Sequence, residues 1–151
     1  MAAKPVPDGY QAVTPYLVVP GVARLIAFLK EAFGASETRP PMARPDGTIM
    51  HAEVRIGDSR VMMGEPMGDF TPMPASLYLY VDDTDAVYKR ALQAGATSVI
   101  EPADQFYGDR NAGVMDPTGN HWWIATHKED VPPAELARRA AAVARREGRA
   151  G

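Results

Sequence analysis

The stretch "YLVVPGVARLIAFLKEAFGA", residues 16–35, carries the pattern that decides the fold. It starts with strand-forming residues, continues with apolar residues at helical spacing, and ends in a Gly-Ala pair. A second stretch, "YLYVDDTDAVYKRALQAGA", residues 78–96, repeats this order. Glycine is preferred where a helix ends in the left-handed conformation, so each stretch predicts a strand, a helix of about three turns and a glycine stop. Asp83 or Thr84 is suited to cap the second helix.

Each predicted helix is followed by three further candidate strands. They are separated by turn-forming sequences such as Pro45-Asp46-Gly47, Gly57-Asp58 and Asp116-Pro117-Thr118-Gly119. The strands expected after the first helix cover residues 36–41, 48–56 and 59–64, and those after the second cover residues 97–101, 107–115 and 120–126. The order βαβββ is therefore predicted twice.

This repetition defines the expected domain organisation. The two units cover residues 11–64 and 76–127, and the Pro- and Met-rich residues 65–75 link them. Residues 128–151 form a tail, in which Leu136, Ala140 and Val143 lie at helical spacing. We predict an α+β fold, in which two βαβββ modules form a cupped mixed sheet. The helices would cover its convex side, leaving a cleft on the concave side.

Alternation along each strand predicts which side chains face that cleft, because neighbouring residues point to opposite faces. In "MHAEVRIG", residues 50–57, Ala52, Val54 and Ile56 belong to the core, so His51 and Glu53 face the cleft. In the last strand the same rule places Trp122 and Ile124 in the core. His121 and Trp123 then face the cleft, as do Tyr16 and Tyr78 on the first strand of each module.

Composition excludes several classes of protein. The chain has 151 residues with 46% hydrophobic and 23% charged residues, which is typical of an ordinary globular domain. With no cysteine it has no disulfides, thiol catalysis or cysteine-bound metal. The net charge of −3 argues against nucleic acid as a partner, although the last 18 residues are basic. The sequence indicates neither a signal peptide nor a membrane span, so we expect a cytoplasmic protein.

Several stretches carry a family resemblance: "TPYLVV", "FLKEAFGA", "DGTIMHAEVRIGDS", "FYGDR" and "DPTGNHWWIATH". Together with the duplicated βαβββ order, they resemble the vicinal oxygen chelate superfamily of glyoxalases, extradiol dioxygenases and antibiotic-resistance binding proteins. They look most like its PhnB-like subgroup. The resemblance covers residues 11–127 and implies a homodimer, with clefts at or near the interface and with modules that pair within one chain or between two.

The resemblance also implies where a divalent metal would bind. Metal-dependent members carry ligands on the first and last strands of each module, and those positions correspond here to Thr14, Glu53, Ser76 and Trp123. Tryptophan does not bind metals and neutral hydroxyls are poor ligands, so Glu53 alone is competent. We therefore expect no cofactor. A divalent metal held by His51, Glu53 and His121 is the alternative.

Six residues are candidate ligand contacts. Tyr16, Tyr78, His121 and Trp123 are expected on the cleft face, and the stretch "FYGDR" adds Tyr107 and Arg110. Arg110, in "FYGDR", is suited either to bidentate binding of an anionic group or to a structural ion pair. The sequence does not decide between these two roles.

Three functions of different class remain open. The first is a binding protein that holds a small aromatic or anionic molecule without the usual metal site. The second is a lyase, isomerase or dioxygenase that uses Glu53 and His51. The third is a regulatory or interaction domain whose cleft is vestigial and whose C-terminal helix makes the contacts.

Overall fold

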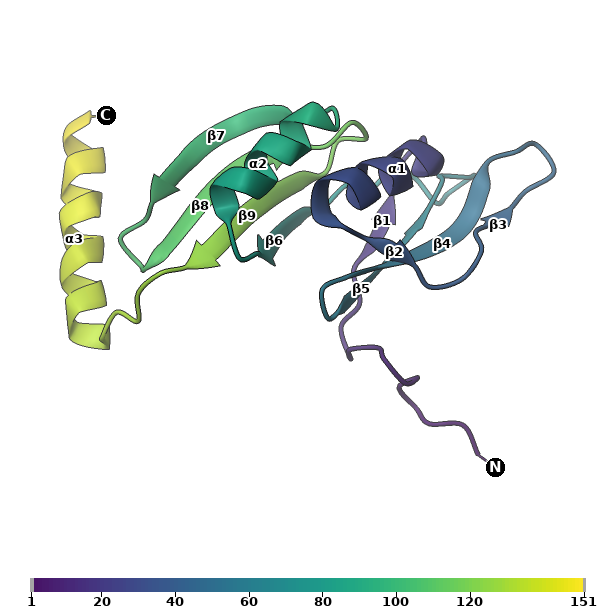
Figure 1. Ribbon diagram of the computed structural model, residues 1–151, viewed down its shortest axis with the longest axis horizontal. Coiled ribbons are helices and arrows are strands. Elements are labelled where there is room, and N and C mark those ends of the chain that lie inside the picture. Colours follow the sequence, from purple (N-terminus) through teal and green to yellow (C-terminus); the bar gives the residue numbers. More distant parts are fainter. Residues whose placement is uncertain (1, 151) are drawn as a thin grey trace.

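The computed structural model describes residues 2–150 and confirms the predicted α+β fold with two βαβββ modules. Figure 1 shows the modules side by side, with the C-terminal helix beyond the second. Module 1 consists of β1 (Tyr16–Val18), α1 (Val22–Phe33), β2 (Ser36–Glu37), β3 (Met42–Ala43), β4 (Ile49–Ile56) and β5 (Ser59–Gly64). Module 2 consists of β6 (Ser76–Tyr80), α2 (Thr84–Gln93), β7 (Thr97–Asp104), β8 (Asp109–Met115) and β9 (His121–His127). The tail forms α3 (Pro133–Ala150).

The two sheets have the same topology. Module 1 has the strand order β1-β5-β4-β2, with β3 also paired to β4, and module 2 has the order β6-β9-β8-β7. In both sheets the first strand runs parallel to the last strand of its module, and the remaining pairs are antiparallel. One difference from the sequence-based expectation lies after α1. Two short strands, β2 and β3, are found there in place of the single strand predicted over residues 36–41.

Strand register makes the modules comparable residue by residue. In module 1, Met62 on β5 lies between Tyr16 on β1 and Glu53 on β4. In module 2, Trp123 on β9 lies between Tyr78 on β6 and Gly113 on β8. Tyr16 therefore corresponds to Tyr78, Met62 to Trp123, and Glu53 to Gly113.

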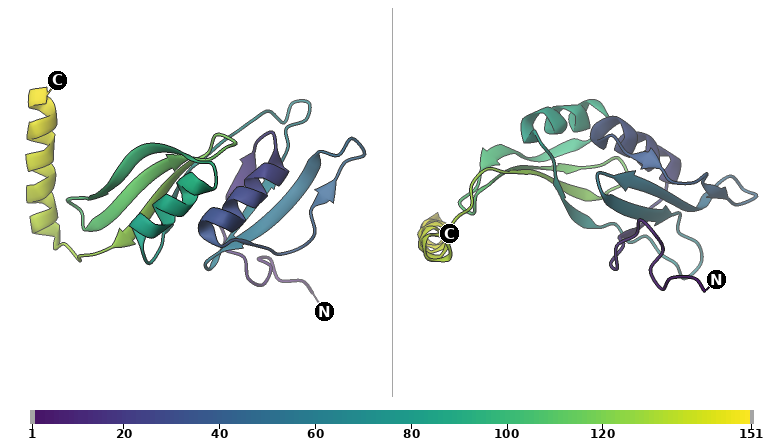
Figure 2. Two further views of the ribbon diagram at one scale, coloured as in Figure 1. Left: turned by 45° about the horizontal axis from the view of Figure 1, so that its top comes forward. Right: turned by 60° about the horizontal axis from the view of Figure 1, so that its bottom comes forward.

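A single core joins the modules beneath the helices. It contains residues of β1, α1, β4 and β5 together with α2, β8 and β9. Phe33 at the end of α1 packs against Trp122 on β9, with 5.0 Å between ring centroids. Figure 2 shows α1 and α2 together on the convex side of both sheets, so the opposite sides form the inner face of an arch. Trp122 thus belongs to the core, as alternation predicts.

The helix ends follow the signals in the sequence. The Asp83 side chain caps α2 by accepting a hydrogen bond from the Ala86 amide at 3.1 Å. Gly34 and Gly95 follow α1 and α2 with φ values of +67° and +110°, which L side chains rarely adopt. The capping prediction and both glycine stops are confirmed.

Helix α3 leaves the body at the outer end of module 2. Arg139 attaches it by bonding the Phe106 carbonyl at 3.2 Å and the Glu129 carboxylate at 2.9 Å. The helix continues through Gly148. Among residues 2–150, no helix has the length and apolar character needed to cross a lipid bilayer.

Candidate ligand site on the concave face

The turn before β9 determines the different environments of the two neighbouring tryptophans. Asp116 is buried and accepts hydrogen bonds from Thr118, from Asn120 and from the indole nitrogen of Trp122, the last at 2.8 Å. These bonds fix Trp122 in the core. Strand alternation then turns Trp123 to the concave face. The "DPTGN" stretch therefore builds the turn, and the following residues supply the site.

Trp123 and Tyr78 form an aromatic wall on this face. Their ring centroids lie 6.5 Å apart, and His121 contacts Trp123 edge-on at 4.7 Å. Beside them on β8 is Gly113, whose lack of a side chain lets His121 and Trp123 pack closely against the strand. A Cβ atom at Gly113 would lie 3.1 Å from Nε2 of His121. The predicted cleft contacts Tyr78, His121 and Trp123 thus lie together in module 2.

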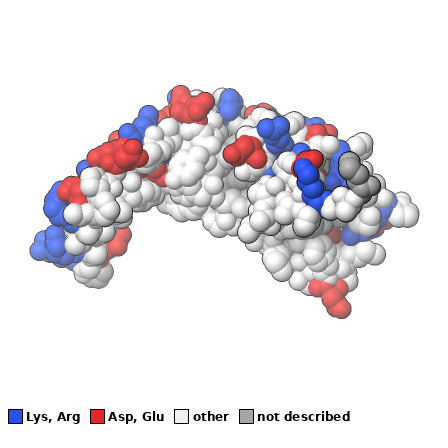
Figure 3. Space-filling view, turned by 90° about the horizontal axis from the view of Figure 1, so that it is seen from below, with Lys and Arg blue, Asp and Glu red and all other residues white. Residues whose placement is uncertain are grey.

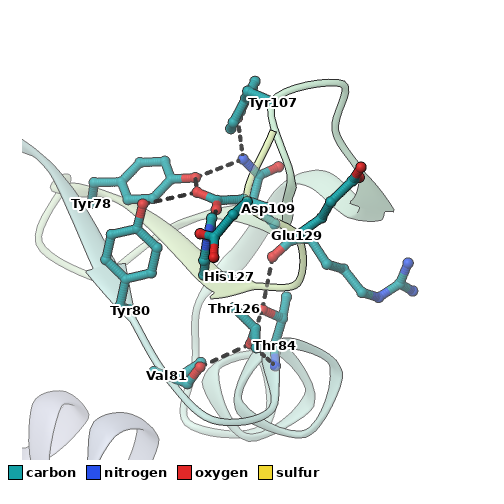
Figure 4. Close-up of polar contacts among 12 residues, drawn as sticks. Tyr78, Tyr80, Val81, Thr84, Tyr107, Asp109, Thr126, His127 and Glu129 are labelled. Carbon is teal, nitrogen blue, oxygen red and sulfur yellow. Dashed lines mark hydrogen bonds and ion pairs between the residues drawn. The ribbon is translucent and has the colours of Figure 1, made fainter. Parts of the chain in front are cut away.

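A buried carboxylate stands at one end of the wall. Asp109 accepts hydrogen bonds from the hydroxyls of Tyr78 at 2.7 Å and Tyr80 at 2.9 Å, and it pairs with Nδ1 of His127 at 2.8 Å (Figure 4). Burial opposes ionisation, but the bonds from His127 and the tyrosines outweigh it and lower the pKa of Asp109. Burial likewise raises the pKa of Tyr78, so this phenol stays protonated.

Asn111 lies next to this carboxylate and has unused hydrogen-bonding capacity. Its side chain is 1% exposed, and its amide nitrogen donates to the hydroxyls of Tyr78 at 3.1 Å and Tyr107 at 2.6 Å. Within the described part of the chain, its carbonyl oxygen and Nε2 of His121 are buried without a partner. An unpaired buried polar atom costs about 1–3 kcal/mol, so both atoms are candidates to contact a ligand.

Two cavities flank the Asp109–His127 pair. One has a volume of about 330 Å³ and is lined by Tyr80, Val81, Asp82, Thr126 and His127. The other, of about 390 Å³, is lined by Asp104, Gln105, Gly108, Asp109, Lys128 and Glu129. Both volumes lie in the range of small-molecule sites.

Arg110 is not part of this group. It follows Asp109 on β8 and therefore points to the opposite face, where it bonds Asp85 of α2 at 2.8 Å and Asp104 at 3.3 Å. Those bonds raise its pKa further above its ordinary value. Of the two roles considered from the sequence, the structure favours the ion pair with α2.

In module 1, Glu53 and His51 form a separate polar cluster with Tyr16. Nε2 of His51 bonds Glu53 at 2.9 Å, and its Nδ1 lies 3.2 Å from the Tyr16 hydroxyl. Glu53 is 1% exposed. Its burial favours the neutral acid, but hydrogen bonds from His51 and Tyr10 and the charge of Arg39 lower its pKa.

Tyr10 completes this cluster, and the sequence did not indicate it. Its hydroxyl donates to Glu53 and accepts from Arg39 at 3.0 Å, while the Arg60 guanidinium lies 4.6 Å from its ring centroid. Tyr10 belongs to a segment without strand or helix periodicity, and 43 positions separate it from Glu53. The Asp8-Gly9 turn is the only nearby sequence signal.

The residues at the expected metal positions are a poor fit for a divalent ion. The expected metal position is on the last strand of each module, but Glu53 lies on β4, the strand before the last one. On β5, the last strand of module 1, Met62 is the residue equivalent to Trp123. The assignment of Glu53 to a last-strand metal position is therefore wrong. The Glu53 carboxylate is also occupied by protein donors. In residues 2–150, no three His, Asp or Glu side chains converge as metal ligands would. His51, Glu53 and His121 therefore do not form the predicted ligand set.

Comparison with known proteins identifies the class. Residues 11–124 match the model of the Glyoxalase/Bleomycin resistance protein/Dioxygenase superfamily, and the chain belongs to this family. An uncharacterized protein of Mycobacterium bovis is 38% identical over 137 residues, which cover 83% of this chain and 89% of that protein.

Solved structures agree with this fold. TioX from Micromonospora sp. ML1 has a TM-score of 0.66 at 25% identity, covering 78% of this chain and 98% of TioX. A PhnB protein from Bacillus cereus, described as a putative 3-demethylubiquinone-9 3-methyltransferase, has a TM-score of 0.61 at 19% identity, covering 77% of this chain and 99% of its own. The second likeness shows the fold alone.

Proposed function

We propose that the protein binds a small planar aromatic molecule on the concave face of module 2 without a metal ion. The observation that carries the proposal is the Tyr78–Trp123 wall above Gly113, with two unpaired buried polar atoms beside it. Aromatic rings stack well on tryptophan and tyrosine, and a few fixed polar groups then select the ligand.

The charges near the wall support a ligand that donates hydrogen bonds. The Asn111 oxygen is an acceptor without a partner, and Asp109 adds a carboxylate. A hydroxyl or amino substituent on the ring would donate to the Asn111 oxygen, whereas an anionic group would be repelled by Asp109. The middle of the arch is mostly neutral in Figure 3, and Arg110 is engaged elsewhere. We therefore narrow the expected aromatic or anionic ligand to a neutral or cationic aromatic.

Matched ligands and two matched tryptophans test this proposal. We expect 1-naphthol to quench tryptophan fluorescence and 1-naphthoate to bind at least about tenfold more weakly, a difference of about 1.4 kcal/mol. Quenching should vanish in Trp123→Phe and persist in Trp122→Phe, because Trp122 lies in the core. Equal binding of both compounds, or quenching that survives in Trp123→Phe, would remove the proposal's basis.

An enzyme of the same superfamily is the second candidate, and the hydrogen-bonded row Tyr16–His51–Glu53 favours it. A histidine held between a carboxylate and a hydroxyl is a common arrangement for proton transfer. If this row is catalytic, its substrate binds beside it in module 1, and His51→Gln will stop conversion of that substrate while 1-naphthol binding at Trp123 persists. Mass spectrometry of the incubated ligand gives the answer.

We also propose that the protein is a homodimer of the PhnB-like subgroup. Large apolar side chains are exposed on both modules and on the linker, among them Met42, Met50, Met67, Met73 and Met115. Exposed apolar side chains favour association where they gather into a patch. Light scattering on eluting protein should give twice the 16.3 kDa chain mass, and a concentration-independent single-chain mass would contradict it.

A further inference from the structure

The chain's own N-terminal segment covers the concave face of module 1. Glu53, Arg60 and Met62 share that face, because Ala52, Val54 and Val61 point into the core. Tyr10 lies on it between Glu53 and Arg60. Figure 2 shows the N-terminal segment on the side of the sheet away from α1. In module 2 the equivalent of Glu53 is Gly113, over which the side chains of His121 and Trp123 pack directly.

The contacts around Tyr10 recognise every chemical feature of a phenol. The hydroxyl donates to Glu53 and accepts from Arg39 at 3.0 Å, so both of its hydrogen-bonding functions are used. The ring faces the Arg60 guanidinium at 4.6 Å, a cation–π distance. Glu53 is itself 1% exposed and is held by Thr38 and His51 as well. The carboxylate is therefore fixed by the body of the module and does not depend on Tyr10 for its position.

The segment that carries Tyr10 is attached through a few neighbouring residues. The Arg60 side chain donates to the Gly9 carbonyl at 2.9 Å, and the Gln11 side chain donates to the Arg60 carbonyl at 3.0 Å. Residues 2–9 are exposed and form neither helix nor strand. Local opening of such a segment requires much less free energy than global unfolding.

We propose that the concave face of module 1 is a phenol-binding site, occupied by Tyr10 in this structure and open to a free phenol when residues 8–11 leave. The ligand class is a phenol with an unhindered hydroxyl, bound by Glu53, Arg39 and Arg60. A phenol that takes this place displaces the N-terminal segment. The site is distinct from the aromatic wall of module 2 and does not rest on it.

The first test measures binding of p-cresol, the tyrosine side chain as a free molecule. All variants carry Trp123→Ala, which removes the module 2 wall, and calorimetry compares Tyr10→Ala with the parent. We expect Tyr10→Ala to bind p-cresol at least about tenfold more tightly than the parent. Toluene, which lacks the hydroxyl, should not show this gain, and adding Glu53→Gln should remove it. A folded Tyr10→Ala variant with no gain, or an equal gain for toluene, overturns the proposal.

A second variant keeps Tyr10 and releases the segment. Gly9 has φ +83°, which valine rarely adopts, and a Cβ atom there would lie 2.7 Å from the end of the Arg60 side chain, so Gly9→Val destabilises the docked position of the segment. Gly47 has a similar φ of +91° but open space around it, which makes Gly47→Val the matched control. We expect Gly9→Val to raise p-cresol affinity and Gly47→Val to leave it unchanged. Equal affinity in both variants overturns the proposal even if Tyr10→Ala fails to fold.

Discussion

The two modules share one backbone plan but differ in what lies on their concave faces. Tyr16 and Tyr78 occupy the same position, and each hydroxyl reaches across its sheet to the third strand, Tyr16 to His51 and Tyr78 to Asn111. On that strand module 1 has the buried Glu53, whereas module 2 has Gly113. In module 1 Tyr10 packs over Glu53, and in module 2 His121 and Trp123 pack over Gly113 as part of the aromatic wall.

This difference shows that the two faces of the sheets in a duplicated fold are under different structural requirements. The core faces of the strands stay apolar in both modules because the helices must pack there. The concave faces carry no such requirement, so a glycine at one position and a glutamate at its equivalent are both compatible with the sheet. Function then depends on side chains and not on the fold.

The largest expected effect is on the turn that builds module 2. Asp116→Ala leaves the buried donors of Asn120 and Trp122 and the partly buried donors of Thr118 without an acceptor. We expect a loss of at least about 3 kcal/mol in the free energy of unfolding. Asp46 makes the same contacts to Thr48 in an exposed turn of module 1, so Asp46→Ala is the control and should cost far less. Equal losses in urea unfolding would contradict a special role for the buried turn.

The next effect concerns the acid stability of module 1. The pKa of Glu53 is lower in the folded chain than in the unfolded chain. Its ionised form therefore stabilises the fold above about pH 4.3 and loses this effect as the pH falls through the folded-state pKa. Glu53→Gln should lower the free energy of unfolding by about 1–3 kcal/mol near neutral pH. The difference from wild type should shrink below pH ~4. A pH-independent difference would show that the carboxylate charge is not the cause.

The close packing of His121 and Trp123 over Gly113 is tested by adding a methyl group there. Gly113→Ala places a methyl group 3.1 Å from His121 and narrows the space beside Trp123. We expect 1-naphthol affinity to fall about tenfold while the thermal midpoint changes little, since the His121 side chain is able to shift. Unchanged affinity would place the ligand elsewhere.

The smallest effect is expected at His127, which is half-exposed. Hydrogen bonds to Asp109 and Asp130 raise the pKa of His127 in the folded chain. Its stabilising effect is therefore complete below about pH 6.5 and is lost as the pH rises through the folded-state pKa. The difference in thermal midpoint between wild type and His127→Gln should be largest in mildly acidic buffer. A difference that grows with pH would contradict this sign.

The sequence predicts local and periodic features of this protein well. Strand and helix order, the cap at Asp83 and the opposite directions of Trp122 and Trp123 all follow from spacing and turn chemistry. The direction of the Arg110 side chain could also have been predicted from the sequence, because Arg110 follows Asp109 on a strand and must face the other way. The role of Tyr10 could not be predicted from the sequence, since its contact with Glu53 depends on how a segment without periodicity folds back over the sheet.

The most direct test of the central claim is the position of the ligand relative to the two indole N–H groups. The Trp122 indole donates to Asp116 in the core, whereas Trp123 stands on the concave face. In two-dimensional ¹⁵N–¹H NMR spectra, with signals assigned through Trp123→Phe, titration with 1-naphthol should shift the Trp123 indole and leave that of Trp122 in place. An unchanged Trp123 signal, with shifts gathered in module 1, would contradict the account.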